Sequence, residues 1–207
     1  TGNVLSLGIT PVGVDQWSKN SKFLQGKIKN VQVLTPDSLE KLLALKPDLI
    51  IAFSNDKNIK KYQEIAPTVA FTYEKYTYTQ IHLTLGKLLG KEKEAKSWVE
   101  KWSKETAEAK TKVKSAIGEN ATATVFETYG KELYVYGNNR DRGTEIIYQA
   151  LGIKTNKQVE KDVFGPGYKA ISTEVIPQYA GDYLFVGKGD AASDNSYLQS
   201  SVWKQIP

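Results

Sequence analysis

Residues 37–53, DSLEKLLALKPDLIIAF, decide the fold class of this chain. A helix-start signal at 36–38 is followed by leucines at helical spacing, and Pro47 ends the helix. The apolar run DLIIAF (48–53) has no alternation, which is typical of a parallel strand buried on both faces. A helix followed at once by such a strand predicts an α/β layer structure.

The same alternation continues on both sides of this stretch. Residues 57–67 predict a short helix that ends at a proline, and residues 68–71 predict another strand. The β-branched run at 9–14 predicts a strand nearer the start. The first part of the chain is therefore expected to form one α/β lobe.

A long helical pattern separates this lobe from a second one. Helices are predicted at 79–90 and 92–117, the latter ending at Gly118. Beyond it, the patterns predict strands at 121–128, 132–137 and 182–187, the last one buried, a helix at 142–151, and a short helix at 172–181 interrupted by Pro177. We expect an N-terminal lobe at 1–90, a connecting helix at 91–118 and a C-terminal lobe at 119–207.

Both ends of the sequence lack elements that such lobes need. The first lobe begins in the middle of a helix without its preceding strand, and the second has too few strands to close its sheet. The expected fold is therefore α/β, with two lobes joined by one long helix, and truncated at both ends.

Composition excludes several classes of function. The chain has no cysteine and one histidine, His82, so a disulfide is impossible and a metal site made of protein side chains is not expected. Since His82 lies among leucines in a helical pattern, we expect it to pack in the core. The net charge is +5, but lysines alternate with acids as on a solvated helix, so no nucleic-acid partner is expected. No apolar run approaches the ~20 residues of a membrane span, and no signal peptide is visible.

The two arginines of the chain stand in one short segment, ELYVYGNNRDRG (132–143). All other basic residues are lysines, whereas Arg140 and Arg142 lie two positions apart after a tyrosine-rich strand. Guanidinium is a rigid, always charged fork of donors that suits planar oxygen acceptors. On this pattern alone, pairing of Arg142 with a surface acid is favoured over a ligand site, because most surface arginines form ordinary ion pairs.

Four segments resemble the iron–hydroxamate siderophore-binding lipoproteins of bacterial ABC importers. They are LSLGITPVGVDQW (5–17), SLEKLLALKPDLIIAF (38–53), YVYGNNRDRGTEIIYQALG (134–152) and ISTEVIPQYAGDYLFVG (171–187). The resemblance implies the class III substrate-binding protein fold, with a ferric siderophore held between the lobes. It also implies a non-enzymatic, monomeric protein without a cofactor, on the outer face of the cell membrane or in the periplasm, whose lipid anchor is absent from this chain.

The resemblance also implies residue roles. Arg142 matches the family's binding arginine, and Tyr134 and Tyr73 match aromatic residues that line the cleft. Arg140 and Tyr168 stand where relatives carry tryptophan, and the extra charge of Arg140 would favour a more anionic complex. Trp17 is a candidate on other grounds, because it follows a strand end, where α/β folds place ligands.

Two acids match residues that dock on the membrane permease in this family. They are Glu40 in the first lobe and Glu174 in the second, and each would form a salt bridge to an arginine of the permease. Exposed pairs contribute only ~0–1 kcal/mol, so such bridges would serve orientation and encounter.

Simpler interpretations stay open for these residues. Arg142 could pair with a surface acid such as Asp141 or Glu145, and the face that carries Tyr134 could belong to the core. Tyr73 could be part of a surface cluster, and Glu40 and Glu174 could be ordinary exposed acids.

Two other functions compete with siderophore binding. A relative with the same fold could bind another iron chelate, haem or cobalamin. An α/β transferase could use the arginines for an anionic substrate, with Asp141 as the near candidate for a general base.

Overall fold

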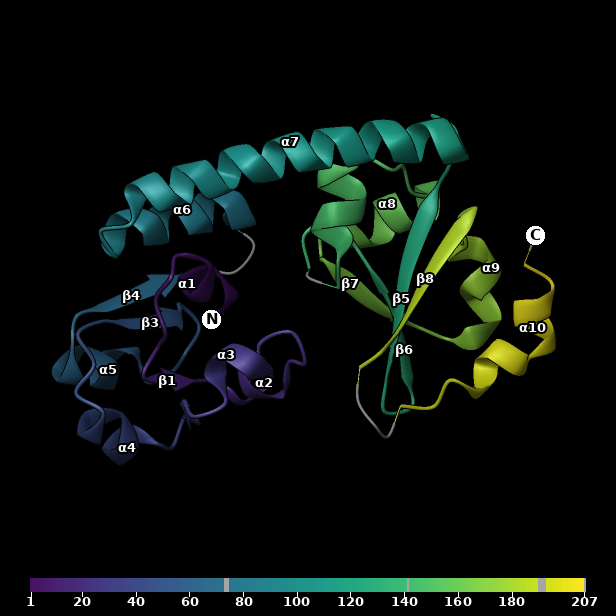
Figure 1. Cartoon of the computed structure of the whole chain (residues 1–207). Helices are drawn as coiled ribbons and strands as arrows, with labels where there is room; N and C mark the ends of the chain where they lie inside the picture. Colours follow the sequence, from purple (N-terminus) through teal and green to yellow (C-terminus); the bar gives the residue numbers. More distant parts are fainter. Residues whose placement is uncertain (73–74, 141, 190–192, 207) are drawn as a thin grey trace. The chain divides into compact units, whose positions relative to one another are not determined.

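The computed structural model describes residues 1–72, 75–140, 142–189 and 193–206. Internal contacts divide the chain into two compact units, Thr1–Glu100 and Lys101–Pro207. The boundary lies inside α7, Glu92–Ile117, which is one continuous helix with the bounds that the sequence predicts (Figure 1). Its acidic first turn and basic last turn suit the helix dipole.

The first unit is built on two pairs of parallel strands. β1 (Gly13–Val14) pairs with β2 (Gln32–Val33), and β3 (Ile50–Phe53) pairs with β4 (Thr68–Phe71). The predicted strand at 9–14 is too long, because Pro11 has no N–H to donate to a ladder. The helices of this unit are α1 (Gly2–Ser6), α2 (Gln16–Asn20), α3 (Gln25–Ile28), α4 (Leu39–Ala44), α5 (Ile59–Ile65) and α6 (Tyr78–Leu88).

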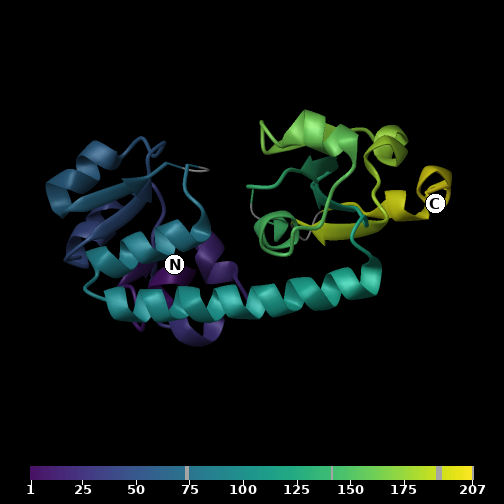
Figure 2. The same cartoon turned by 90° about the horizontal axis from the view of Figure 1, so that it is seen from above.

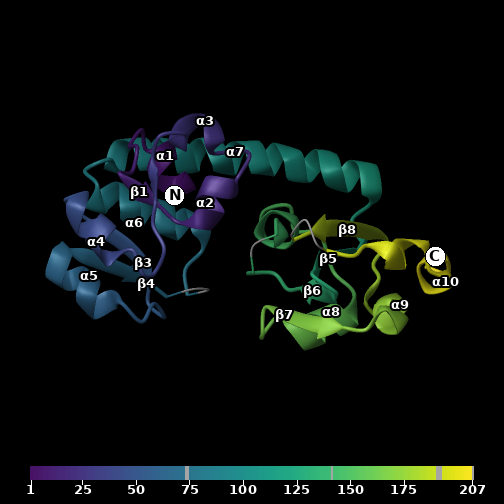
Figure 3. The same cartoon turned by 90° about the horizontal axis from the view of Figure 1, so that it is seen from below.

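Strand β3 is covered on one face, not on two as predicted. Ile50 packs with Leu42 of α4 and with Ala66 just after α5. Figure 3 shows these two helices beside β3. Ile51 and Phe53 point to the other face and are 40% and 50% exposed. The expectation of burial on both faces is wrong for β3, because the apolar cluster on that side packs against Val69 and Phe71 of β4 and leaves Ile51 and Phe53 partly exposed.

Helix α6 packs beside the first turns of α7 (Figure 2). It begins with a capping box, in which Thr77 and Gln80 satisfy each other's backbone N–H groups. His82 is fully buried at this contact, with its ring 4.5 Å from that of Trp98 and Nδ1 3.1 Å from Oδ1 of Asn3. The predicted packing role of His82 is confirmed.

His82 makes the stability of the first unit depend on pH. Burial lowers the pKa of His82 below its ordinary value of about 6.5. The unfolded chain therefore binds a proton more readily, so stability is fully present above about pH 6.5 and falls as the pH drops below it. We expect His82→Gln to lose less melting temperature than the wild type between about pH 7.5 and pH 5.5. An equal loss in both proteins, measured by circular dichroism, would exclude this role.

The second unit contains a mixed sheet with the strand order β7-β6-β5-β8. β5 (Ala123–Tyr129) is antiparallel to β6 (Glu132–Tyr136) and parallel to β8 (Tyr183–Lys188), and β6 is antiparallel to β7 (Tyr168–Ile171). The remaining elements are η1 (Glu145–Ala150), α8 (Lys157–Val163), η2 (Thr173–Val175), α9 (Ile176–Tyr179), η3 (Ser196–Gln199) and α10 (Ser201–Lys204). Pro177 lies in the first turn of α9, where a missing N–H costs nothing, so it starts a helix rather than interrupting one.

The two faces of this sheet differ in character. One face is apolar, with Phe126 and Val135 packed against Val159 and Ile176 of α8 and α9. The opposite face is apolar at Ala123 and Val125, where Ile147 and Tyr148 of η1 cover it. Farther along, the same face becomes polar, and the candidate site lies there.

Strand β8 is an edge strand and is not buried as predicted. Tyr183 and Phe185 are 43% and 46% exposed. Since β8 pairs with β5 alone among the described strands, its outer edge and part of one face remain uncovered.

Candidate ligand-binding site

Three tyrosines from neighbouring strands form a platform on the polar end of this face. Tyr134 and Tyr136 lie on β6, two residues apart, and Tyr168 on β7 is in register with Tyr136. The Tyr136 and Tyr168 rings are stacked, with centroids 6.1 Å apart, and Tyr134 lies 5.9 Å from Tyr168. Tyr136 is buried, whereas Tyr168 is 42% exposed. We call these three residues the tyrosine platform.

Both arginines lie over this platform. The guanidinium carbon of Arg140 is 4.8 Å from the ring centroid of Tyr168, and that of Arg142 is 5.4 Å from the centroid of Tyr136. Both are within the range of cation–π attraction. The structure therefore brings together four predicted site residues, Arg140, Arg142, Tyr134 and Tyr168.

A buried carboxylate lies beneath Arg142. Oε2 of Glu127 accepts from Nε of Arg142 at 2.7 Å and from the hydroxyl of Tyr136 at 2.9 Å. The Glu127 side chain is 9% exposed, whereas that of Arg142 is 38% exposed. Burial, and then the bond to Glu127, raises the pKa of Tyr136 to about 12, so its hydroxyl remains a donor at neutral pH.

The backbone around Arg142 is unusual. Arg142 has φ of 57° and Gly143 has φ of 79°, so neither can continue a right-handed helix. The predicted helix at 142–151 is therefore wrong at its start, and the chain instead forms the π-helix η1, which begins at Glu145. A non-glycine residue held at positive φ is a form of stored strain that is common at binding sites.

Neighbouring contacts hold the segment that carries the arginines. The Arg140 N–H donates to Oγ1 of buried Thr144 at 3.4 Å, and Nε2 of Gln149 donates to the Asn138 carbonyl at 2.5 Å. The N–H of Gly137, where the segment leaves β6, donates to the Gly167 carbonyl at 2.7 Å.

Three of the other predicted site residues belong to elements other than β6, β7 and the segment that carries the arginines. Trp17 is in α2 of the first unit and is 71% exposed. Tyr73 lies outside the described residues. Glu40 is exposed in the first turn of α4, and Glu174 is exposed in η2 of the second unit.

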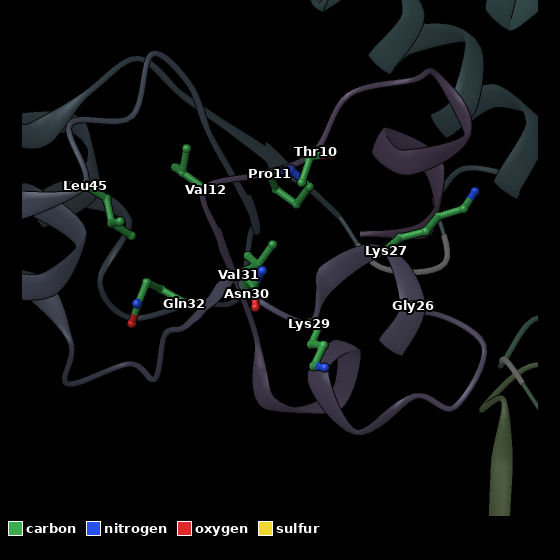
Figure 4. A pocket seen from close by; sticks show the side chains of 10 residues that line it. All are labelled: Thr10, Pro11, Val12, Gly26, Lys27, Lys29, Asn30, Val31, Gln32 and Leu45. Atoms are coloured by element: carbon green, nitrogen blue, oxygen red, sulfur yellow. The ribbon is translucent and has the colours of Figure 1, made fainter.

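A shallow groove of about 500 Å³ in the first unit contains none of the predicted site residues within the described chain (Figure 4). Its walls are largely the segments that lead into β1 and β2, including Thr10, Lys27 and Lys29. Parallel sheets bind ligands beyond the carboxyl ends of their strands, and this groove lies at the amino ends. We therefore place the candidate site on the tyrosine platform.

Glu127 and Tyr136 were not predicted as site residues. A lone acid between Phe126 and Thr128 in an apolar strand is a signal, because a buried carboxylate needs a cationic partner. The described residues contain no cluster of His, Cys, Asp or Glu arranged to hold a metal ion. None of the described helices combines the length and apolar character needed to cross a membrane.

The sequence and the fold also match those of known proteins. The pattern of the family described as "Periplasmic binding protein" matches residues 1–207. The chain belongs to that family. The assignment agrees with the α/β architecture of both units and confirms the predicted class III fold.

Individual relatives show which members of the family this chain is similar to. The chain is 38% identical to the iron(3+)-hydroxamate-binding protein FhuD of Bacillus subtilis, over 99% of this chain and 66% of the relative. It is also similar to the structure of FhuD2 from Staphylococcus aureus with bound ferrioxamine B, with a TM-score of 0.92 and 38% identity, covering 100% of this chain and 80% of that one. SirA from S. aureus complexed with staphyloferrin B gives a TM-score of 0.85 at 29% identity, over 100% and 76% of the two chains. The predicted resemblance to hydroxamate-binding proteins is confirmed, and the chain spans slightly less than two thirds of the length of this curated relative.

Proposed function

We propose that this chain is the substrate-binding component of an ABC importer that captures a ferric hydroxamate siderophore and delivers it to the permease. The observation that carries the proposal is the pair of guanidinium groups over the tyrosine platform. The similarity to FhuD and to ferrioxamine-bound FhuD2 supports the same class of ligand. The role is binding, not catalysis.

The chemistry of the ligand fits the residues of the platform. A hard ferric ion prefers oxygen ligands, and the hydroxamates already supply them. The protein then needs to recognise only the outside of the complex. Guanidinium groups suit its partly negative oxygens, and tyrosine rings suit its organic shell while placing a hydroxyl at the rim.

A quenching assay tests the ligand class. The chain has four tryptophans, whose fluorescence can be titrated with ferric ferrioxamine B, ferrichrome, a ferric catecholate, ferric citrate and ferric staphyloferrin B. We expect saturable quenching at the lowest concentrations with the two hydroxamates. Tighter binding of any of the other three complexes would contradict the assignment. If staphyloferrin B bound most tightly, the protein would be a carrier of a different iron chelate.

We further propose that Glu40 and Glu174 dock on the permease and that the protein works outside the cytoplasm on a lipid anchor. Each acid is exposed, and each lies in a different unit, so the permease could engage both units at once. Paired charges of this kind act mainly through orientation and association rate.

Charge reversal separates docking from binding. We expect Glu40→Lys with Glu174→Lys to reduce siderophore uptake into vesicles that hold the permease by about tenfold or more, because attraction becomes repulsion. Ferrioxamine B affinity should be unchanged. Glu64→Lys with Glu160→Lys is the matched control, since these acids are also exposed, one in each unit. Equal uptake by both double variants would exclude the docking role.

A further inference from the structure

We propose that Glu127 is the positioning residue of the site, holding Arg142 and the Tyr136 hydroxyl in the arrangement that a ferric hydroxamate complex meets. This inference rests on the proposed function for its ligand, whereas the contacts from which it starts lie within the protein itself. It assigns a role to a residue that sequence patterns did not single out.

The first argument is the sharing of one carboxylate oxygen by two site groups. Oε2 of Glu127 lies 2.7 Å from Nε of Arg142 and 2.9 Å from the Tyr136 hydroxyl. Tyr136 lies on β6 and Arg142 lies in the segment that follows β6. Glu127 lies on the neighbouring strand β5, opposite Tyr134 in the ladder. A single rigid strand thus fixes an arginine and a platform ring together.

The second argument is entropic. An arginine side chain has many rotamers, and immobilising it on ligand binding costs conformational entropy. Because Glu127 holds the side chain, this entropy is lost when the protein folds and not when the ligand binds. Such preorganisation raises affinity. A charge-assisted bond to a 9% exposed carboxylate is strong enough to do so.

The third argument is the strained backbone of Arg142. Its φ of 57° suits glycine better than arginine. The Nε bond to Glu127 and the contact with the Tyr136 ring are interactions that stabilise the side chain in this conformation. Glu127 therefore determines where the guanidinium lies, and the exposed 38% of the Arg142 side chain is the part that a ligand can reach.

The test compares Glu127→Gln, Arg142→Gly and the double variant. Glutamine keeps the shape of the side chain but removes its charge. We expect Glu127→Gln to weaken ferrioxamine B binding about tenfold, which corresponds to the loss of one charge-assisted bond. In the Arg142→Gly background the same change should weaken binding much less than tenfold, because only the Tyr136 hydroxyl is then left for Glu127 to position. Glu132→Gln is the control, since Glu132 is an exposed acid on β6.

A second readout needs no ligand. In the wild type the pKa of Tyr136 is about 12, and in Glu127→Gln the ultraviolet titration of that tyrosine should move to a lower pH while burial still holds its pKa above the ordinary value. The positioning role would be overturned by an unshifted Tyr136 titration or by an unchanged affinity in Glu127→Gln. It would also be overturned if the affinity loss of the double variant equalled the product of the two single losses. If the wild type binds no hydroxamate, the proposed function fails and the role toward that ligand fails with it, whereas wild-type binding with an unaffected Glu127→Gln variant overturns the positioning role alone.

Discussion

Replacing Arg142 by glycine is expected to weaken the binding of ferric ferrioxamine B by roughly 100-fold. Central arginines of binding sites commonly contribute 2 kcal/mol or more, and about 1.4 kcal/mol corresponds to each tenfold change. Arg142 lies over the ring of Tyr136, and in the proposed function it is the cation that meets the hydroxamate oxygens. The loss is expected in affinity measured by tryptophan quenching.

The same substitution has opposing effects on stability. Glycine adopts φ of 57° without strain, which gains about 1 kcal/mol, whereas Glu127 loses its cationic partner. The folded fraction should therefore change much less than the affinity. Binding as tight as that of the wild type would contradict the assignment of Arg142.

Lys46 provides a matched control for this experiment. Like Arg142, it is a non-glycine residue with positive φ, here 46°, and it is an exposed cation. Lys46→Gly removes the same charge and relieves the same type of strain, but it lies between α4 and β3, away from the tyrosine platform along the chain. We expect its affinity to equal that of the wild type.

Of the substitutions proposed for this protein, Gly137→Ala is expected to lower the free energy of unfolding the most. A Cβ at this position would overlap the backbone carbonyl of Val163 and would lie 3.2 Å from the Gly167 carbonyl. Neither is the end of a flexible side chain, so the backbone itself must move. Such overpacking typically costs about 1–3 kcal/mol.

Affinity should fall together with stability in this variant. The segment that carries both arginines leaves β6 at Gly137, so a shift there moves Arg140 and Arg142 relative to the platform. Chemical denaturation and ligand titration measure the two effects. Gly165→Ala is the control, because a Cβ at Gly165 meets no atom within 4 Å. Equal stability of the two variants would show that the close approach at Gly137 is not present.

Local patterns in the sequence predicted the elements that depend on nearby residues. The bounds of α7 follow from an uninterrupted helical pattern that ends at a glycine, and the parallel pairing of β3 and β4 follows from the helix between them. The likeness to known siderophore-binding proteins predicted Arg142, Tyr134 and Tyr168 as site residues, and the structure places all three in one cluster.

Long-range pairing explains what the sequence could not predict. Tyr168 meets Tyr136 only because β7 pairs with β6 in one register, and Glu127 reaches Arg142 only because β5 pairs with β6. The exposed faces of Ile51 and Phe185 depend on which helices and strands cover them, which an apolar run does not encode. The left-handed Arg142 contacts Glu127 on β5 and Tyr136 on β6, and local propensity does not place these two strands beside it.

X-ray absorption at the iron edge of the protein–ferrioxamine B complex tests the central claim most directly. If the arginines and tyrosines hold the complex from outside, the iron keeps its hydroxamate oxygens alone, and the spectrum should match that of the free complex. A phenolate, carboxylate or imidazole ligand entering the iron coordination sphere would contradict this account.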